Sequence, residues 1–433
     1  MPSSTRSERT GWYMYDWANS AFSTTVITVL LPKYSTALAR AGADADGNIR
    51  ILGLAIYADS YWSFMMAFSV ILQVLVLPVI GTLADTSAHK KRLLAMCAYA
   101  GSIPTIGLFF IQSGNWQAVA PLFIVANVAF GASIVVSNSF LNDLSAPEER
   151  DAVSSRGWAI GYIGGGLLLL LNLLLVQNAE KLGMSEGYAV RVSLASSGLW
   201  WALFTIWPLV TLRDRPPVVQ RSGKFLGATF GQFVHTLRDM RRYPQALTFL
   251  IAYLLYNDAV QAVISLSSQF ATEELGIAIG DLMPVILAVQ FVAFAGAMLF
   301  GGLARLVGAK ATIMLQLVIW TALVIGVYAA VQTLRDFWIA SMVVALVLGG
   351  TQALSRSLFS LLIPKGREAE YFSLYEISDK GTAWLAPAIF GVTLNFTRNY
   401  RSAIVSLIAF FILGLIVLAR VRVQPADAAV RSS

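Results

Sequence analysis

The sequence contains very little cysteine, histidine or charge. Among its 433 residues are one cysteine, Cys97, and two histidines, His89 and His235. A single cysteine cannot form an internal disulfide, and so few sulfur and imidazole ligands argue against a Cys/His metal site. There is also no glycine-rich loop ending in Gly-Lys-Ser/Thr, which excludes a P-loop ATPase within this sequence. We therefore expect no metal, no cofactor and no enzymatic activity.

The shortage of charge points to a membrane protein. Charged residues make up 13% of the chain, against about a quarter in soluble domains, while 57% is hydrophobic and the mean hydropathy is +0.67. The apolar segments form a series, each near the ~20 residues that a helix needs to cross a bilayer. The twelve predicted spans lie near residues 12–39, 54–83, 93–112, 116–143, 152–177, 190–211, 244–271, 281–304, 311–332, 336–362, 371–397 and 402–420. The sequence therefore predicts an all-α membrane protein with two groups of six transmembrane helices.

The distribution of lysine and arginine predicts the orientation. If the N-terminus is cytoplasmic, most of the 31 basic residues fall on the cytoplasmic side, which is the bias expected of membrane proteins. Both termini are then cytoplasmic, and the net charge of +7 needs no nucleic-acid partner. The predicted parts are an N-terminal bundle (1–211), a cytoplasmic linker (212–243), a C-terminal bundle (244–420) and a cytoplasmic tail (421–433).

The linker has a periodic apolar pattern in its second part. The apolar residues at helical steps are Leu226, Phe230, Phe233, Leu237 and Met240. This pattern predicts an amphipathic helix on the cytoplasmic leaflet. A solvated linker with chance periodicity is the alternative.

The two halves of the sequence resemble each other. The stretch GTLADTSAHK (81–90) aligns with GGLARLVGAK (301–310), and SNSFLNDLSAPEER (137–150) aligns with SRSLFSLLIPKGRE (355–368). The two matches have nearly the same offset and the same order. They indicate a duplicated six-helix unit, which is the plan of the major facilitator transporters.

Several motifs make this resemblance specific. GTLADTSAHKKR (81–92) resembles the loop motif between helices 2 and 3 of the major facilitator superfamily, and WYMYDWANSAF (12–22) resembles the opening motif of its vacuole effluxer-like branch. Further segments that resemble this branch lie at 155–166, 253–261 and 351–384. Fungal members of the branch export amino acids from the vacuole, whereas most bacterial members have no known substrate. The resemblance implies the major facilitator fold and transport of a small molecule.

The sequence also departs from the pattern. Arg305 stands where the first half has Asp85, and Ala259 stands where a glycine is expected after Asp258. In the WLAP segment (384–387), a glycine would be expected before the proline. These changes leave the predicted fold intact, but they do not allow a substrate to be copied from relatives.

Polar residues form stripes on four predicted spans, and a polar stripe belongs against protein or a wet cavity rather than lipid. The stripes comprise Asp16, Asn19, Ser20 and Ser23; Asn127, Asn138 and Asn142; Asn257, Asp258, Gln261, Ser265 and Ser268; and Gln352 and Arg356. The resemblance implies that spans 1, 4, 7 and 10 line the central cavity. We predict a substrate site formed by Asp16, Asn19, Ser23, Asn127, Asn138, Asp258, Gln261, Gln352 and Arg356.

Two carboxylates are candidates for proton coupling, Asp258 and Glu376. A change in the surroundings of a membrane-embedded carboxylate can load and release a proton. Asp258 with Arg356 is the preferred set, because these charges lie deepest in the predicted cavity helices. Structural alternatives remain open for the carboxylates. Asp16 can pair with a basic residue at the cytoplasmic gate, and Glu376 can pair with Lys380 within one helix.

The first-half loop motif predicts a cytoplasmic gate formed by Gly81, Asp85, Lys91 and Arg92. Asp85 can accept hydrogen bonds from a helix N-terminus, whose partial positive charge favours an anion. The resemblance suggests that this helix is the eleventh span. In the fifth span, glycines at positions 157, 161 and 165 are four residues apart and predict close helix packing.

These observations predict a secondary active transporter of a small polar metabolite, with proton-coupled amino-acid efflux as the specific expectation. A passive facilitator and a non-transporting receptor or assembly factor on the same scaffold are the alternatives. The expected partners are the substrate, protons and the lipid bilayer, and a monomer is favoured. The expected location is the bacterial inner membrane, with multiple spans.

Overall fold

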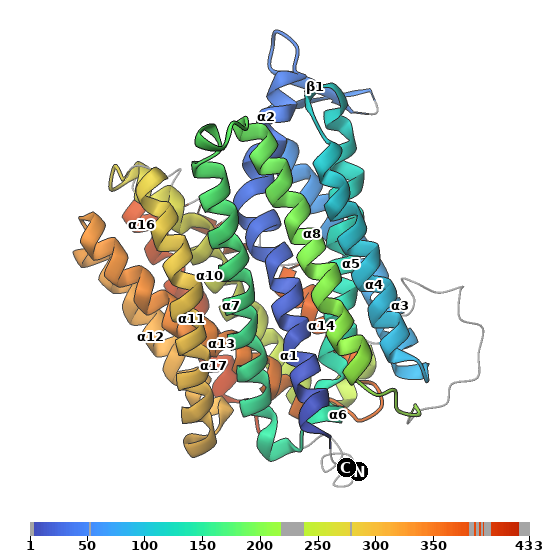
Figure 1. The fold of residues 1–433 in the computed structure, drawn as a ribbon. Coiled ribbons are helices and arrows are strands. Elements are labelled where there is room, and N and C mark those ends of the chain that lie inside the picture. The colour runs from blue at the N-terminus through green and yellow to red at the C-terminus, as the bar shows by residue number, and fades with distance from the viewer. Residues whose placement is uncertain are drawn as a thin grey trace.

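The computed structural model describes residues 4–51, 53–217, 238–277, 279–380, 385–386, 389–390, 393 and 400–423. The described chain is helical almost throughout, with a single short hairpin at one end (Figure 1). We call residues 4–217 the N-terminal half and residues 238–423 the C-terminal half. The predicted amphipathic helix falls mainly on residues 218–237 and so lies outside the described residues.

The N-terminal half begins with one continuous helical rod. Helix α1 (Arg6–Ala21) passes through the π-helical segment η1 (Phe22–Leu30) into α2 (Leu31–Ala41). Thr5 and Glu8 start the rod with a capping box, in which each side chain accepts a hydrogen bond from the other residue's backbone N–H. The sequence did not predict the π-helical segment, which places Ser23 outside regular α-helical spacing.

The remaining elements of this half follow the predicted series. They are β1 (Asn48–Ile51), β2 (Leu54–Tyr57), η2 (Ala58–Ser60), α3 (Tyr61–Thr86), α4 (Lys90–Gly107), η3 (Leu108–Phe110), η4 (Ser113–Ala118), α5 (Val119–Ser139), α6 (Leu141–Leu144), η5 (Pro147–Glu149), α7 (Arg150–Gln177), η6 (Glu180–Leu182) and α8 (Glu186–Thr211). The two strands are antiparallel, with Ile49 opposite Ile56.

The C-terminal half repeats the pattern of long helices. Its elements are η7 (Met240–Arg242), α10 (Pro244–Glu273), α11 (Ile279–Val307), α12 (Ala309–Ala330), α13 (Leu334–Leu362), α14 (Glu368–Lys380), α16 (Tyr400–Val405) and α17 (Ile408–Ala419).

Within the described part of the chain, 9 helices are long and apolar enough to cross a membrane. They correspond to the second through tenth predicted spans. The first predicted span is the rod formed by α1, η1 and α2, the eleventh includes residues that are not described, and the twelfth is divided between α16 and α17. The total of twelve crossings therefore stays a prediction.

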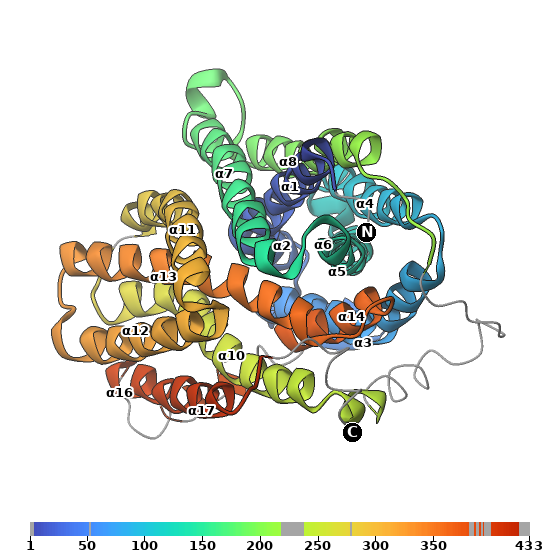
Figure 2. The ribbon, with the colours of Figure 1, turned by 90° about the horizontal axis from the view of Figure 1, so that it is seen from below.

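Two hydrophobic clusters form the cores. One is built from residues between Trp12 and Leu212 together with Ala369, and the other from residues between Met240 and Val421. The predicted boundaries of the two bundles and of the linker stay predictions. In Figure 2, α14 lies along α3, and α7 faces α11 and α13, so these helices form the contact between the halves.

The two ends of the molecule differ. At one end α1 begins and α3 terminates, close to the start of α14, and we call this the latch end. The opposite end bears β1 and β2, and we call it the hairpin end (Figure 1). The charge distribution predicts that the latch end faces the cytoplasm.

Candidate functional site

Arg356 lies at the centre of a buried polar cluster that joins the two halves. Its Nη1 and Nη2 atoms each lie 3.1 Å from Asp16 Oδ2. Its Nε donates to Ser154 Oγ at 2.9 Å, its Nη2 donates to the Ser154 carbonyl at 2.9 Å, and its Nη1 donates to Asn138 Oδ1 at 3.3 Å. These four residues, which we call the Arg356 cluster, come from α1, α5, α7 and α13. The side chain of Arg356 is only 4% exposed.

Two tryptophans cover the guanidinium group. The Arg356 Cζ atom lies 4.6 Å from the ring centroid of Trp12 and 5.5 Å from that of Trp158. Trp12 is held in place because its Nε1 donates to the Ser137 carbonyl at 2.8 Å. Such cation–π contacts are strongest in desolvated sites, so the two rings both stabilise the charge and limit access of water to it.

A glycine allows α7 to approach the ion pair. A Cβ atom at Gly157 would lie 2.5 Å from Asp16 Oδ2 and 2.9 Å from Arg356 Nη2. At Gly161 it would lie 2.8 Å from Ser20 Oγ. The predicted close packing of this glycine stretch is therefore present, and its partner is α1.

Additional hydrogen bonds join α7 to α13 beside the Arg356 cluster. Ser154 Oγ donates to the Ala353 carbonyl at 2.7 Å, and Ser357 Oγ donates to Asp151 Oδ1 at 2.5 Å. One turn nearer the latch end, Arg150 Nη1 donates to the Ser360 carbonyl at 2.7 Å. All of these bonds cross from one half to the other, so the halves are closely joined in this part of the molecule.

Asp85 and Gly81 contact the start of α14. Asp85 Oδ1 accepts a hydrogen bond from the Ala369 backbone N–H at 2.9 Å, and Oδ2 accepts one from the Glu370 backbone N–H at 2.8 Å. We call this contact the Asp85 latch. A Cβ atom at Gly81 would lie 2.6 Å from the Ala369 carbonyl oxygen, so only glycine permits the approach. The contact matches the helix terminus expected from the sequence, and a gating role for it stays a prediction.

The basic residues after the latch have different partners. The Lys91 backbone N–H donates to Asp214 Oδ1 at 2.8 Å, and its Nζ donates to the Leu212 carbonyl at 3.3 Å. Arg92 is exposed. In the described part of the chain Lys91 therefore does not join the Asp85 latch, and a gating role for Lys91 and Arg92 stays a prediction. Lys91 instead fastens the start of the linker, because the chain after α8 returns past the beginning of α4.

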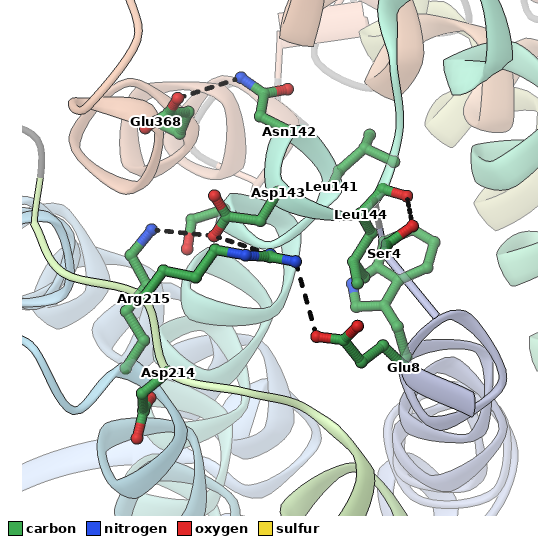
Figure 3. Close-up of polar contacts among 12 residues, drawn as sticks. Ser4, Glu8, Leu141, Asn142, Asp143, Leu144, Asp214, Arg215 and Glu368 are labelled. Atoms are coloured by element: carbon green, nitrogen blue, oxygen red, sulfur yellow. Dashed lines mark hydrogen bonds and ion pairs between the residues drawn. The ribbon is translucent and has the colours of Figure 1, made fainter. Parts of the chain in front are cut away.

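The start of the linker is also held by Arg215, as Figure 3 shows. Arg215 lies between two acidic side chains, with its Nη2 3.5 Å from Glu8 Oε1 and its Nη1 3.9 Å from Asp143 Oδ2. The far end of the linker is attached to the other half, where Asp239 pairs with Arg367 and accepts a hydrogen bond from the Tyr371 hydroxyl at 3.3 Å.

Asp258 and Arg356 do not form the preferred pair. Arg356 pairs with Asp16, whereas Asp258 on α10 accepts a hydrogen bond from the Ala386 backbone N–H at 2.7 Å. Asp258 is buried, and its Oδ1 has no hydrogen-bond partner within the described ranges. The reason is geometric, because Arg356 points from α13 across the interface into the N-terminal half.

A second buried polar cluster lies within the C-terminal half. Gln352 Nε2 donates to Asn257 Oδ1 at 2.9 Å, and Asn257 Nδ2 donates to Asp379 Oδ1 at 2.8 Å. The Tyr253 hydroxyl donates to the same Asp379 oxygen at 2.7 Å. Asp379 was not predicted as a site residue, although its place between Glu376 and Lys380 in an apolar span was a signal.

The other candidate residues are dispersed. Asn127 donates to Ser69 Oγ at 2.8 Å and its carbonyl accepts from Gln73, all within the N-terminal half. Asn19 Nδ2 donates to the Tyr15 carbonyl of its own helix at 2.9 Å. Of the predicted cavity residues, the structure therefore gathers Asp16, Asn138 and Arg356 around one centre.

Three further candidates also lie outside these clusters. Ser23 and Gln261 are half-buried, and Glu376 is buried in α14. Ser154 is the member of the Arg356 cluster that the sequence did not predict, because it lies in the polar start of α7, next to Ser155 and Arg156, and not in a stripe along the span. Among the described side chains, no three His, Cys, Asp or Glu residues gather in a way that could hold a metal ion.

Comparison with known proteins agrees with this architecture. The family model described as vacuole effluxer Atg22 like matches residues 4–430. An uncharacterized MFS-type transporter, YxiO of Bacillus subtilis, is 32% identical over 95% of this chain and 94% of its own length. Autophagy-related protein 22 of Kluyveromyces lactis is 25% identical over 94% of this chain and 91% of its own.

The fold recurs in solved transporter structures. The transporter FucP, crystallised in the outward conformation, superposes with a TM-score of 0.73 at 13% identity, covering 97% of this chain and 100% of FucP. At that identity the likeness shows the fold alone, which is that of the major facilitator superfamily. The chain is therefore an integral, multi-pass membrane protein of the transporter class and not an enzyme, and it belongs to the vacuole effluxer Atg22-like family of major facilitator transporters.

Proposed function

We propose that the protein is a proton-coupled secondary transporter that exports or exchanges a small polar metabolite, with amino acids as the favoured class. The observation that supports this proposal most directly is the Arg356 cluster. A buried cation of one half is bound there by three residues of the other half. In alternating access the two halves rock around a central site, so the cluster lies where such a movement must be controlled.

The free energy needed to separate Arg356 from Asp16 makes the cluster suitable for controlling the movement of the two halves. Opening the latch end would pull Arg356 away from Asp16, and removing one partner of a buried ion pair costs about 3–5 kcal/mol. A compensating ligand would lower that cost. The carboxylate of a substrate can replace Asp16 beside the guanidinium group, and a proton on Asp16 would remove the charge that holds Arg356.

Three carboxylates, of which Asp16 is partly buried and Asp258 and Glu376 are buried, are available to bind the coupling proton. Asp16 is the foremost, because its protonation would act directly on a contact between the halves. Asp258 offers an oxygen without a partner within the described ranges, and Glu376 lies in α14 near the second polar cluster. This second cluster, with its amide and hydroxyl groups, suits recognition of a polar rather than an apolar solute.

We also propose how the protein is oriented in the membrane and which conformation the structure represents. The excess of basic residues at the latch end supports a cytoplasmic latch end in the bacterial inner membrane. We propose that this conformation is the one closed toward the cytoplasm, which is supported by the hydrogen bonds between the halves near the latch end. We propose that the reverse arrangement opens the Asp85 latch and separates the Arg356 cluster.

Counterflow in proteoliposomes tests the function. Vesicles containing the purified protein are loaded with an unlabelled amino-acid panel, and uptake of each radiolabelled amino acid is followed with and without an imposed pH gradient. We expect counterflow of at least one amino acid and accumulation only with the gradient. Counterflow without gradient-driven accumulation would indicate a passive facilitator, and the absence of both across the panel would contradict the proposal.

A matched pair of variants sharpens this test. Asp16→Asn should abolish accumulation driven by the gradient, because the amide cannot gain or lose the coupling proton. Asp46→Asn is the control, since Asp46 is an exposed carboxylate in the loop before β1. Gradient-driven accumulation by Asp16→Asn equal to that of the wild type would exclude Asp16 as the proton site.

A further inference from the structure

A cavity at the hairpin end lies apart from the Arg356 cluster. It has a volume of about 380 Å³ and is lined mainly by α2 and by the start of α3. The polar and aromatic residues around it are Lys33, Thr36, Arg40, Asp59, Trp62 and Ser63. Lys33 is 17 positions after Asp16 on the same rod, or roughly 25 Å at 1.5 Å per residue. We call this space the Lys33 cavity.

The Lys33 cavity has one uncompensated positive charge. Arg40 and Asp59 neutralise each other, with Arg40 Nε 2.5 Å from Asp59 Oδ1. Lys33 is exposed and forms no hydrogen bond or ion pair with the described part of the chain. A single free ammonium group matches an anionic group of one charge. The neighbouring ion pair presents a carboxylate that can also attract an ammonium group.

Contacts with neighbouring elements hold residues at the wall of the cavity in place. The ring of Trp62 packs against Phe123 of α5 with centroids 4.8 Å apart. Tyr34, next to Lys33, donates its hydroxyl to the Ile111 carbonyl at 2.8 Å. The elements that carry the cavity are therefore anchored, and ligand binding would order chiefly the free side chain of Lys33.

Helical spacing places Lys33 and Arg40 on the same face of α2. Lys33, Ala37 and Arg40 recur at helical spacing and so share one face of α2. The opposite face is buried in the N-terminal half through Leu31 and Leu38. Figure 2 shows α2 near the middle of the molecule in projection, between α7 and α14. The face of α2 that carries Lys33 and Arg40 is exposed, so a solute can reach it at the hairpin end.

We propose that the Lys33 cavity is a peripheral binding site for a small amino carboxylate, in which Lys33 binds the carboxylate and Asp59 faces the ammonium group. The site rests on the proposed function and adds a second place in the molecule at which its favoured substrate class would bind. Its volume lies at the small end of the range for ligand pockets, which is about 300–1,000 Å³. Lys33 would then select carboxylates before they reach the Arg356 cluster.

A cysteine reporter tests binding without transport. The substitution Ser63→Cys places a thiol at the cavity in a Cys97→Ala background, and modification of this reporter thiol by N-ethylmaleimide, a neutral reagent, is timed in proteoliposomes. L-alanine, L-leucine and L-arginine are each added at equal ionic strength and compared with their C-terminal amides. We expect at least one free amino acid to slow the modification several-fold and its amide to have no effect.

Charge variants identify the residue responsible. In the same reporter background, Lys33→Gln should abolish the protection and Lys33→Arg should retain it. Arg335→Gln is the matched control, because Arg335 is an exposed basic residue at the start of α13 outside the cavity. Equal protection by acid and amide, protection that survives Lys33→Gln, or no protection by any of the three amino acids would overturn the proposal.

Counterflow on the same vesicles separates the two proposals. If an amino acid exchanges but never protects the reporter thiol, the peripheral site is wrong and the transport function stands. If an amino acid protects the reporter thiol in a Lys33-dependent manner but none is exchanged, the transport function is wrong and the binding site stands.

Discussion

Arg356 hydrogen-bonds to Asn138, the residue that occupies the equivalent position in the first-half repeat, 218 positions earlier. Two further contacts between the halves are related to each other by the same offset of 218 positions. Asn142 Nδ2 donates to Glu368 Oε1 at 3.4 Å, while Arg150 donates to the Ser360 carbonyl. In the aligned segments Asn142 corresponds to Ser360 and Arg150 to Glu368, so each contact is the counterpart of the other. The interface between the halves therefore follows the internal repeat.

Neutralising Asp16 should favour opening of the latch end. Asp16→Asn removes the charge opposite Arg356 but retains an acceptor, and hydrogen bonds to charged groups contribute about 1.5–3 kcal/mol. Double electron–electron resonance between labels on α6 and α14 should show a larger population of long distances. Asp46→Asn serves as the control, and unchanged distance distributions in Asp16→Asn would argue against the proposed control point.

A double-mutant cycle should reveal coupling between Asp16 and Arg356. Arg356→Gln leaves Asp16 buried without its cation, so it should lower thermal stability more than the Asp16→Asn/Arg356→Gln double variant does. Residues in direct contact show interaction energies of about 0.5–3 kcal/mol. Additive effects on the melting temperature in detergent would mean that the pair contributes no net coupling.

A single methyl group at Gly157 should disturb the Arg356 cluster. In Gly157→Ala the new Cβ would clash with Asp16 and Arg356, and overpacking of this kind costs about 1–3 kcal/mol. Gly302→Ala on α11 is the matched control, because its Cβ would meet no atom of the described chain within 4 Å. We expect a lower melting temperature and reduced counterflow for the first variant alone. Equal melting temperatures and equal counterflow for the two variants would show that α7 can shift to accommodate the methyl group without loss of stability or transport.

The Asp85 latch should depend on charge. Asp85→Asn loses the interaction between the carboxylate and the N-terminus of α14, which contributes about 0.3–1 kcal/mol and up to ~2 kcal/mol when partly buried. The same distance measurements should shift toward an open latch end. Asp214→Asn is a suitable control, since Asp214 accepts its hydrogen bond from Lys91 within the N-terminal half. If the latch has no gating role, both variants should give the same distance distributions as the wild type.

Asp258 offers a test of the alternative proton site. If it carries the coupling proton, Asp258→Asn should abolish gradient-driven accumulation and leave exchange at equal pH partly intact, because the amide resembles the protonated acid in size. Glu376→Gln is tested in parallel. Wild-type accumulation by both variants would leave Asp16 as the coupling group.

The sequence predicted the helical series and several local contacts, but not the partners that meet between the halves. Nine described spans agree with the apolar pattern, and the latch between Asp85 and the start of α14 was expected. The bond between Arg356 and Asp16 joins residues 340 positions apart. Polar stripes identify the face of a helix that avoids lipid, whereas the partner of each side chain depends on how two separate helices cross.

Other features could not be predicted from the sequence because they depend on the backbone geometry of a segment or on how helices pack. The π-helical segment η1 contains six consecutive β-branched residues, Thr24 to Val29, a run from which no change of helical register was predicted. Asp379 joins Tyr253 and Asn257 because α14 packs beside α10. This arrangement is a property of tertiary packing and not of local sequence.

The linker is fastened at both of its described ends, to a different half at each. Arg215 attaches one end to Glu8 and Asp143, and Asp239 attaches the other to Arg367. A cut in the polypeptide between these two points would therefore leave both attachments intact. Synthesised as two separate chains in one cell, the halves would retain every described contact by which they recognise each other, and they should assemble into a two-piece transporter.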